Sequence, residues 1–90
     1  MIDKRKFYIN GQWVSPSKPN DYEVINPSTE EAFATISLGS TEDTNAAVSA
    51  AKKALVSWSE SSKDERLNLL EKLLSIYKKR YGEMADAISM

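Results

Sequence analysis

The chain carries one strong turn signal near its start, Phe7-Tyr8-Ile9-Asn10-Gly11-Gln12-Trp13-Val14. Asn-Gly is typical of a type I′ turn, because both central residues of that turn need a positive φ angle and its twist matches the twist of the flanking strands. The residues on either side are rich in aromatic and β-branched side chains, which favour strands. We therefore predict an antiparallel hairpin over residues 7–14, with Asn10 and Gly11 both at positive φ.

A two-residue loop also determines which residues of the two strands face each other. The expected pairs are Ile9 with Gln12, Tyr8 with Trp13 and Phe7 with Val14. Because opposed residues share a face, each face of the ribbon carries apolar side chains. A lone hairpin is marginally stable in water, so we expect both faces to be covered by other parts of a protein.

Two further strands are expected before residue 40. Residues 22–25 form the first, which ends at Asn26-Pro27 because proline favours an extended residue before it and a turn after it. Residues 32–38 form the second. Its expected apolar face comprises alternate residues, Ala32, Ala34, Ile36 and Leu38.

Two amphipathic helices are expected after residue 40. Ser40 with Asp43, and Ser62 with Glu65, have the spacing of capping boxes at the start of each helix. The first helix shows a stripe of mostly small residues, Ala47, Ala51, Ala54, Leu55 and Trp58. The second shows a larger stripe at alternating spacings of three and four, Leu67, Leu70, Leu74, Tyr77, Tyr81, Met84 and Ile88. The short connection at 60–62 predicts helices that fold back on each other.

These elements predict an α+β segment, with strands and a hairpin over residues 1–40 and two helices over residues 41–90. Both parts are expected to belong to one incomplete domain. The helical pattern reaches Met90 without a cap, so we expect the natural fold to continue beyond it.

Composition excludes several classes of function. The chain has 90 residues, 12 basic and 13 acidic, for a net charge of −1, which gives no field to attract nucleic acid or an anionic membrane. No apolar run approaches the roughly 20 residues of a membrane span, and no apolar segment follows the charged N-terminus as in a secretory signal. A cytoplasmic protein is expected. With no Cys and no His, the chain cannot form a thiolate zinc site or the common nucleophile–base pairs.

The remaining candidate sites have simpler structural interpretations. The adjacent acids Glu30-Glu31, Glu42-Asp43 and Asp64-Glu65 lie in turns or first turns of helices, where carboxylates act as caps. The basic run at residues 4–6 is expected to be a solvated N-terminal end rather than a phosphate site. The three glycines are isolated, so no phosphate-binding loop is present. We assign no catalytic and no cofactor-binding residue to this chain.

The order of these motifs resembles the N-terminal segment of the NAD(P)-dependent aldehyde dehydrogenase superfamily. The resemblance rests on the hairpin at 7–14, on Val-Ile-Asn-Pro-Ser-Thr-Glu-Glu at 24–31, on the Ala-rich helix after Asp43, and on Trp58 followed by Glu65-Arg66 and Leu70. It covers essentially the whole chain. Glu30 departs from the pattern, because many members carry Gly there, and a non-glycine residue disfavours positive φ.

The resemblance implies an α/β fold for the intact protein, in which this segment packs on the cofactor-binding domain. It implies oxidation of an aldehyde to a carboxylic acid: a cysteine thiohemiacetal passes hydride to NAD or NADP, and water hydrolyses the thioester. The nucleophilic Cys, the general-base Glu, the oxyanion Asn and the nicotinamide-binding segments come later in the family and map onto none of residues 1–90. A homo-oligomer is also implied.

Some family members bind a monovalent cation through backbone carbonyls of the strand before Asn-Pro. By this resemblance, the carbonyls of Val24 and Ile25 are candidate cation ligands here. An ordinary strand carbonyl is the simpler interpretation of both.

The alternative function is a stand-alone interaction module that binds a partner through the stripe at 67–88. On the enzyme interpretation, the isolated 90 residues should neither oxidise aldehydes nor bind NAD(P). They should also be partly molten or self-associated, since the stripe and the hairpin would normally bury against chain beyond Met90 in the same subunit.

Overall fold

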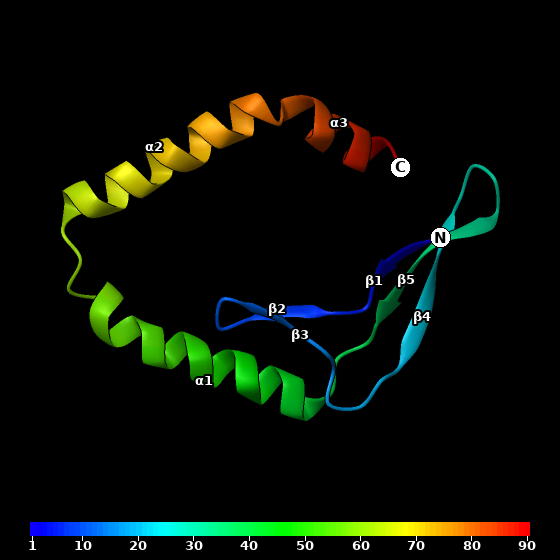
Figure 1. The fold of residues 1–90 in the computed structure, drawn as a ribbon, viewed down its shortest axis with the longest axis horizontal. Helices are drawn as coiled ribbons and strands as arrows, with labels where there is room; N and C mark the ends of the chain where they lie inside the picture. Colours follow the sequence, from blue (N-terminus) through cyan, green and yellow to red (C-terminus); the bar gives the residue numbers. More distant parts are fainter. The chain divides into compact units, whose positions relative to one another are not determined.

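The computed structural model describes residues 1–90 and contains five strands followed by three helices (Figure 1). The strands are β1 (Ile2–Lys4), β2 (Phe7–Ile9), β3 (Gln12–Val14), β4 (Asp21–Asn26) and β5 (Glu31–Ser37). The helices are α1 (Thr41–Trp58), α2 (Lys63–Lys79) and α3 (Tyr81–Ser89). The predicted α+β class is confirmed.

Two compact units divide the chain, Met1–Val56 and Ser57–Met90, and each is described by itself. The expected grouping of residues 1–40 and 41–90 into parts of one domain stays a prediction.

The hairpin β2–β3 has the predicted register, with Phe7 opposite Val14, Tyr8 opposite Trp13 and Ile9 opposite Gln12. Asn10 and Gly11 have φ angles of 54° and 75°, which confirms the type of turn expected from Asn-Gly. The rings of Tyr8 and Trp13 pack across the strands with centroids 5.1 Å apart. Both rings are nevertheless 63% and 65% exposed, so residues 1–90 leave this face of the hairpin open.

A separate three-stranded sheet has the order β1-β5-β4, with β5 in the middle. β4 and β5 are antiparallel, and β1 pairs in parallel with β5 from Ile2 opposite Ala34 to Lys4 opposite Ile36. The sequence prediction missed β1 and took residues 4–6 for a solvated end. The three residues of β1 show no alternation of apolar and polar side chains. The strand forms because the backbone of β5 offers a free edge for pairing.

A register shift interrupts the pairing of β4 with β5. Val24 lies opposite Ala34 and Ile25 lies opposite Ala32, so Phe33 is an extra residue on β5, the arrangement of a β-bulge. The bulge breaks the alternation expected for this strand, and the strand ends at Ser37. Leu38, expected on the apolar face, therefore lies outside the strand and is 44% exposed, whereas Ala34 and Ser37 are the most buried residues, at 6% each.

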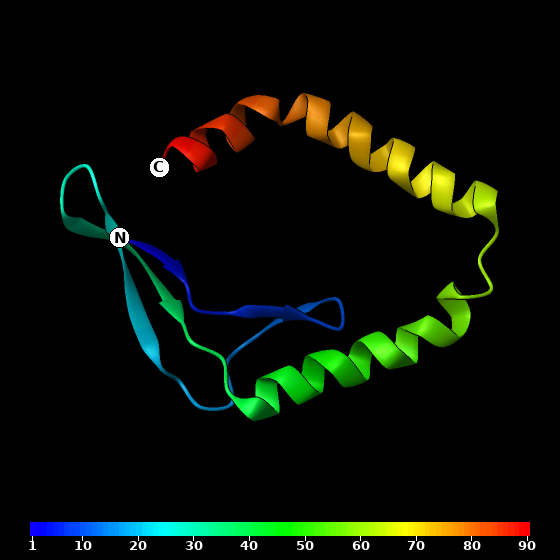
Figure 2. The same cartoon turned by 180° about the vertical axis from the view of Figure 1, so that it is seen from behind.

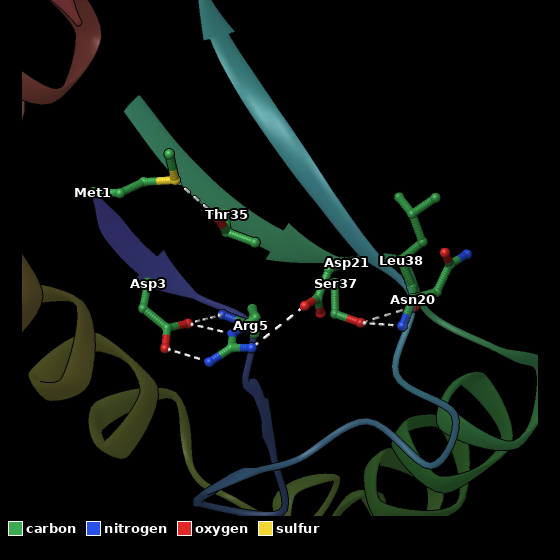
Figure 3. Close-up of polar contacts among 8 residues, drawn as sticks. All are labelled: Met1, Asp3, Arg5, Asn20, Asp21, Thr35, Ser37 and Leu38. Atoms are coloured by element: carbon green, nitrogen blue, oxygen red, sulfur yellow. Dashed lines mark hydrogen bonds and ion pairs between the residues drawn. The ribbon is translucent and has the colours of Figure 1, made fainter. Parts of the chain in front are cut away.

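Ser37 can be buried because its hydroxyl group is hydrogen-bonded. It accepts a hydrogen bond from the Asn20 backbone N–H (3.2 Å) and donates one to the Leu38 carbonyl (3.3 Å), as Figure 3 shows. The Leu38 N–H in turn donates to the Asn20 carbonyl (2.8 Å). These hydrogen bonds join the residue before β4 to the end of β5, at the end of the pair opposite its turn.

The turn between β4 and β5 follows Asn26-Pro27 as predicted. The Asn26 carbonyl accepts the Glu30 N–H at 2.7 Å, and the Asn26 side chain accepts the Ser28 N–H at 2.9 Å. Glu30 has a φ angle of 60°, a left-handed conformation that glycine adopts more easily. A turn conformation that favours Gly is therefore made here by Glu30, at the expense of some backbone strain.

Both predicted helix starts are present. The Ser40 and Ser62 hydroxyls accept the N–H groups of Asp43 (3.4 Å) and Glu65 (3.1 Å), respectively. The second predicted helix, however, is two helices, because α2 ends at Lys79 and α3 begins at Tyr81. The same interruption is visible from behind in Figure 2.

The interruption falls on Arg80, with φ −106° and ψ 17°, and not on the helix-weakening Gly82. The Arg80 N–H still bonds to the Ile76 and Tyr77 carbonyls, which tightens the last turn of α2. Beside it, the rings of Tyr77 and Tyr81 meet edge to face, with centroids 5.7 Å apart. None of the three helices contains a buried residue, and none is long and apolar enough to span a membrane.

Candidate functional site

The candidate cation ligands, Val24 and Ile25, lie in β4 on the edge of the sheet. Successive carbonyls of a regular strand point to opposite sides, so two neighbours rarely approach one ion. The bulge shifts the pairing of β4 with β5 between these two residues, although its extra residue, Phe33, belongs to β5. Carbonyl oxygens are the ligands by which proteins replace the hydration shell of K⁺. The cation site at Val24 and Ile25 stays a prediction.

The acidic pairs remain in separate elements. Glu30 and Glu31 lie at the β4–β5 turn, and Asp64 and Glu65 occupy the first turn of α2. No group of three or more carboxylates is arranged to hold a metal ion. Each pair therefore has a local structural role, in a turn or at the start of a helix.

Asp43 shows what such a carboxylate does in this chain. It accepts the backbone N–H of Ser17 and the backbone N–H of Ser40, both at 3.0 Å. These two hydrogen bonds, with that of Ser17 the stronger influence, hold the pKa of Asp43 below its usual range. The carboxylate thus ties the loop after the hairpin to the start of α1.

Side chains extend this contact into a polar cluster. The hydroxyls of Ser17 and Ser40 are 2.8 Å apart, Glu42 accepts from Ser40 at 3.1 Å, and Lys18 pairs with Glu42 at 3.5 Å. A groove of about 640 Å³ lies beside this cluster, lined by residues of the hairpin, of the loop and of α1. Sequence analysis found the capping role of Asp43 but missed its contact with Ser17, since no local spacing links residues 26 positions apart.

Arg5 has a comparable structural role near the N-terminus. Its guanidinium donates to Asp3 at 2.9 and 3.0 Å and to Asp21 at 3.3 Å, as Figure 3 shows. The Arg5 guanidinium lowers the pKa of Asp3 from its ordinary 3.8 to about 2. The basic run is therefore not simply a solvated end: Arg5 links the end of β1 to the start of β4, and its charge is already neutralised.

The glycines do not form a site for a dinucleotide phosphate. Gly11 lies in the hairpin turn, Gly39 lies against the ring of Phe7, and Gly82 lies within α3. Aromatic rings could stack on a ligand, and two pairs are present, Tyr8–Trp13 and Tyr77–Tyr81. Neither pair lies beside a phosphate-binding loop. These residues thus do not fit NAD or NADP, and we derive no catalytic step from them.

A second groove lies on the helical unit, where α2 meets α3. It measures about 300 Å³ and is lined by Leu73, Ile76, Tyr77, Arg80, Glu83, Met84 and Ala87. Most of these residues are apolar, and the predicted stripe of the second helix supplies two of them, Tyr77 and Met84. This groove has the chemistry of a packing surface and carries no nucleophile.

Comparisons with known proteins agree with the motif order. The sequence model of the aldehyde dehydrogenase family matches residues 13–90. A 3-succinoylsemialdehyde-pyridine dehydrogenase from Pseudomonas is 47% identical over 89 residues, which are 99% of this chain and 19% of that protein. The crystal structure of an aldehyde dehydrogenase from Bartonella henselae matches all of this chain, and 19% of its own, with 59% identity and a TM-score of 0.98.

The chain thus spans about a fifth of the length of the relatives that it matches, in their N-terminal part. The family match over residues 13–90, with the predicted hairpin and turn in place, agrees with the resemblance seen in the sequence. The chain belongs to the aldehyde dehydrogenase family.

Proposed function

We propose that residues 1–90 are the N-terminal part of an enzyme that oxidises an aldehyde to a carboxylic acid with NAD or NADP as hydride acceptor. One observation carries the proposal: the whole chain superimposes on an aldehyde dehydrogenase structure at 59% identity. The segment itself supplies neither nucleophile nor cofactor site, so its contribution to the enzyme is structural.

The substrate is an aldehyde whose identity depends on residues outside this segment. The name of the Pseudomonas relative specifies a semialdehyde linked to pyridine, so this compound is the first one to test. Aliphatic and aromatic aldehydes without a second polar group complete the panel.

The test uses the natural polypeptide that contains these residues, purified and mixed with each aldehyde and with NAD⁺ or NADP⁺. We expect absorbance of the reduced nicotinamide to rise with at least one aldehyde and one cofactor. The 90-residue chain is the matched control and should give no reduction and no saturable binding of NAD⁺ in a calorimetric titration, because it lacks a thiol and a phosphate loop. A folded natural protein that is inactive with every pair would contradict the proposal.

We also propose that the carbonyls of Val24 and Ile25 bind a monovalent cation in the intact enzyme. The proposal is supported by the register shift between Val24 and Ile25, where the bulge at Phe33 of β5 interrupts the regular pairing of β4. Thermal melting of the natural protein in KCl, NaCl and choline chloride at equal ionic strength tests it. A melting temperature that is the same in all three salts would contradict it, since a ligand bound only to the folded state must raise stability.

The same enzyme is proposed to be a cytoplasmic homo-oligomer. Light scattering during size-exclusion chromatography of the natural protein, and fractionation of its source cells, test the two statements separately. A monomeric mass would contradict the first, and recovery with the membrane fraction would contradict the second.

A further inference from the structure

The turn of the hairpin contains the one asparagine of residues 1–90 that is followed by glycine, Asn10 before Gly11. Both residues are exposed. Asparagine is thermolabile in proteins, because the backbone nitrogen of the next residue can attack its side-chain carbonyl carbon. Glycine in the next position leaves this nitrogen most accessible, since it carries no Cβ. The turn therefore combines the two residues that favour this reaction.

The Gly11 nitrogen is open to reaction in the folded chain. No backbone hydrogen bond of the turns and loops uses its N–H group, and no atom lies within 4 Å of the position that a Cβ would take. The last pair of the hairpin is Ile9 with Gln12, so the ladder of the two strands ends before Gly11. Asn10 borders a groove on the side of the loop and another on the side of α1. Close packing therefore does not surround the turn within residues 1–90.

The other four asparagines lack this combination. Asn26 is followed by proline, whose nitrogen carries no hydrogen. Asn45 and Asn68 lie inside α1 and α2, where the following N–H bonds to the carbonyl four residues earlier. Asn20 is held by hydrogen bonds of both its N–H and its carbonyl. Asn10 is thus the site that the structure leaves open to attack.

We propose that Asn10 is a site of spontaneous deamidation, at which the intact protein accumulates aspartate and isoaspartate with age. The Gly11 nitrogen bonds to the side-chain carbonyl carbon (Cγ) of Asn10, the bond from Cγ to the amide nitrogen breaks, and ammonia leaves with the proton of the Gly11 N–H. Water then opens the imide ring. Opening at Cγ gives aspartate, and opening at the former backbone carbonyl gives isoaspartate, whose main chain runs through the side chain.

The two products should affect the hairpin differently. Asp-Gly suits the same type I′ turn as Asn-Gly, so aspartate should leave the register unchanged. Isoaspartate adds a carbon to the main chain of the turn, which disrupts the two-residue loop that pairs Ile9 with Gln12. The ring contact of Tyr8 with Trp13, with centroids 5.1 Å apart, depends on this register. Isoaspartate at residue 10 should therefore loosen the hairpin.

The test incubates the natural protein that contains these residues at physiological temperature and at several pH values. Peptide mass spectrometry measures the conversion of each asparagine, and an isoaspartyl methyltransferase with labelled S-adenosylmethionine measures isoaspartate. We expect Asn10 to be converted about tenfold faster than any other asparagine of residues 1–90, because only its neighbour lacks a Cβ. The rate should rise with pH, since the attacking nitrogen must lose its proton. The proposal does not rest on the enzymatic function.

Two substitutions separate the reaction from the structure of the turn. Asn10→Gly gives Gly-Gly, which also suits a type I′ turn, but it has no side-chain amide and should form no isoaspartate at residue 10. Gly11→Ala places a Cβ beside the attacking nitrogen and should slow the conversion of Asn10 about tenfold, although alanine strains a turn with positive φ. A faster conversion in Gly11→Ala would overturn the proposal, because mobility of the turn, and not access to the nitrogen, would then control the reaction.

The effect on the hairpin is measured on the aged protein. Anion exchange separates deamidated molecules, which carry an additional negative charge, and hydrogen exchange of residues 7–14 compares them with freshly purified Asn10→Asp. We expect faster exchange only in the isoaspartate fraction, and equal exchange in the two would overturn the effect on the hairpin. If Asn10 stays intact in the folded protein while the urea-denatured chain deamidates, the fold protects the turn and the site itself is refuted.

Discussion

The two units of the chain differ in how far along the sequence their contacts reach. In Met1–Val56, Arg5 bonds to Asp21, Ser17 bonds to Asp43, and the Thr35 hydroxyl donates to the Met1 sulfur at 3.1 Å. In Ser57–Met90, the contacts that shape the helices are local: Glu65 with Ser62, Arg80 with Glu83, and Ser89 with Ala85. The first unit contains part of a tertiary structure, and the second contains helices whose apolar side chains remain exposed.

The comparison shows that a segment can have the backbone conformation of its family without a hydrophobic core of its own. Only Ala34 and Ser37 are buried in the entire chain. Strand pairing and polar contacts shape the first unit, whereas helix caps and i,i+4 hydrogen bonds shape the second. Four substitution or pH experiments on residues 1–90 within the natural protein test this contrast.

The largest effect is expected from Ala34→Asp in the centre of the sheet. A carboxylate placed at this buried position has no partner, and an uncompensated buried charge costs about 3–5 kcal/mol. We expect the amide signals of residues 21–37 to lose their dispersion in a heteronuclear NMR spectrum, while those of 63–79 stay in place. Tyr22→Asp, at an exposed position of β4, is the control and should keep the sheet; loss of both regions in Ala34→Asp would show that the units are not independent.

The two serine caps give a smaller and more selective difference. Ser40→Ala and Ser62→Ala should each destabilise their helix by about 1 kcal/mol, because each leaves an N–H without its cap. Only Ser40→Ala should also speed hydrogen exchange of the Ser17 amide, since the lost Ser40 hydroxyl donates to the Asp43 carboxylate that holds this amide and contacts the Ser17 hydroxyl. An unchanged Ser17 amide would show that Asp43 holds the loop without help from Ser40.

Acid should affect the first unit through Asp3 and Asp43. Both carboxylates have pKa values lowered in the folded chain, so the stability they contribute is present above their ordinary pKa and is lost as the pH falls toward the folded value. For Asp3 this range runs from 3.8 down to about 2. The urea midpoint, followed at signals of residues 2–37, should therefore decrease over this range, and Asp3→Asn with Asp43→Asn should flatten the decrease. A profile of the same slope in the double variant would assign acid sensitivity to other groups.

The smallest effect is expected at the ion pair between Arg80 and Glu83. Both side chains are 66% exposed, and exposed pairs contribute little because water and salt screen them. Glu83→Gln should leave the helical circular dichroism near 222 nm within error of the wild type. A clear loss of helicity would show that the pair, and not the backbone at Arg80, maintains the junction of α2 and α3.

The sequence predicted the elements that depend on neighbouring residues. Asn10-Gly11 predicted the turn and the register of the hairpin, and Ser62 with Glu65 predicted the start of α2. The stripe that continues through Tyr77 and Tyr81 hid the helix break between them, because the spacing of apolar residues is the same on both sides. The candidate site was predicted by resemblance alone, since a strand carbonyl leaves no signature in side-chain chemistry.

By itself, the sequence determined the hairpin, the helix caps and the family, because turn, cap and motif signals are read over a few adjacent positions. Tertiary structure alone decided that β1 joins β5, that Phe33 is the extra residue of a bulge beside Val24 and Ile25, and that Asp43 reaches Ser17. These features join residues far apart in the chain, and a backbone hydrogen bond between distant residues can form with almost any side chain. Local composition therefore carries no record of such a bond, and only the folded backbone reveals it.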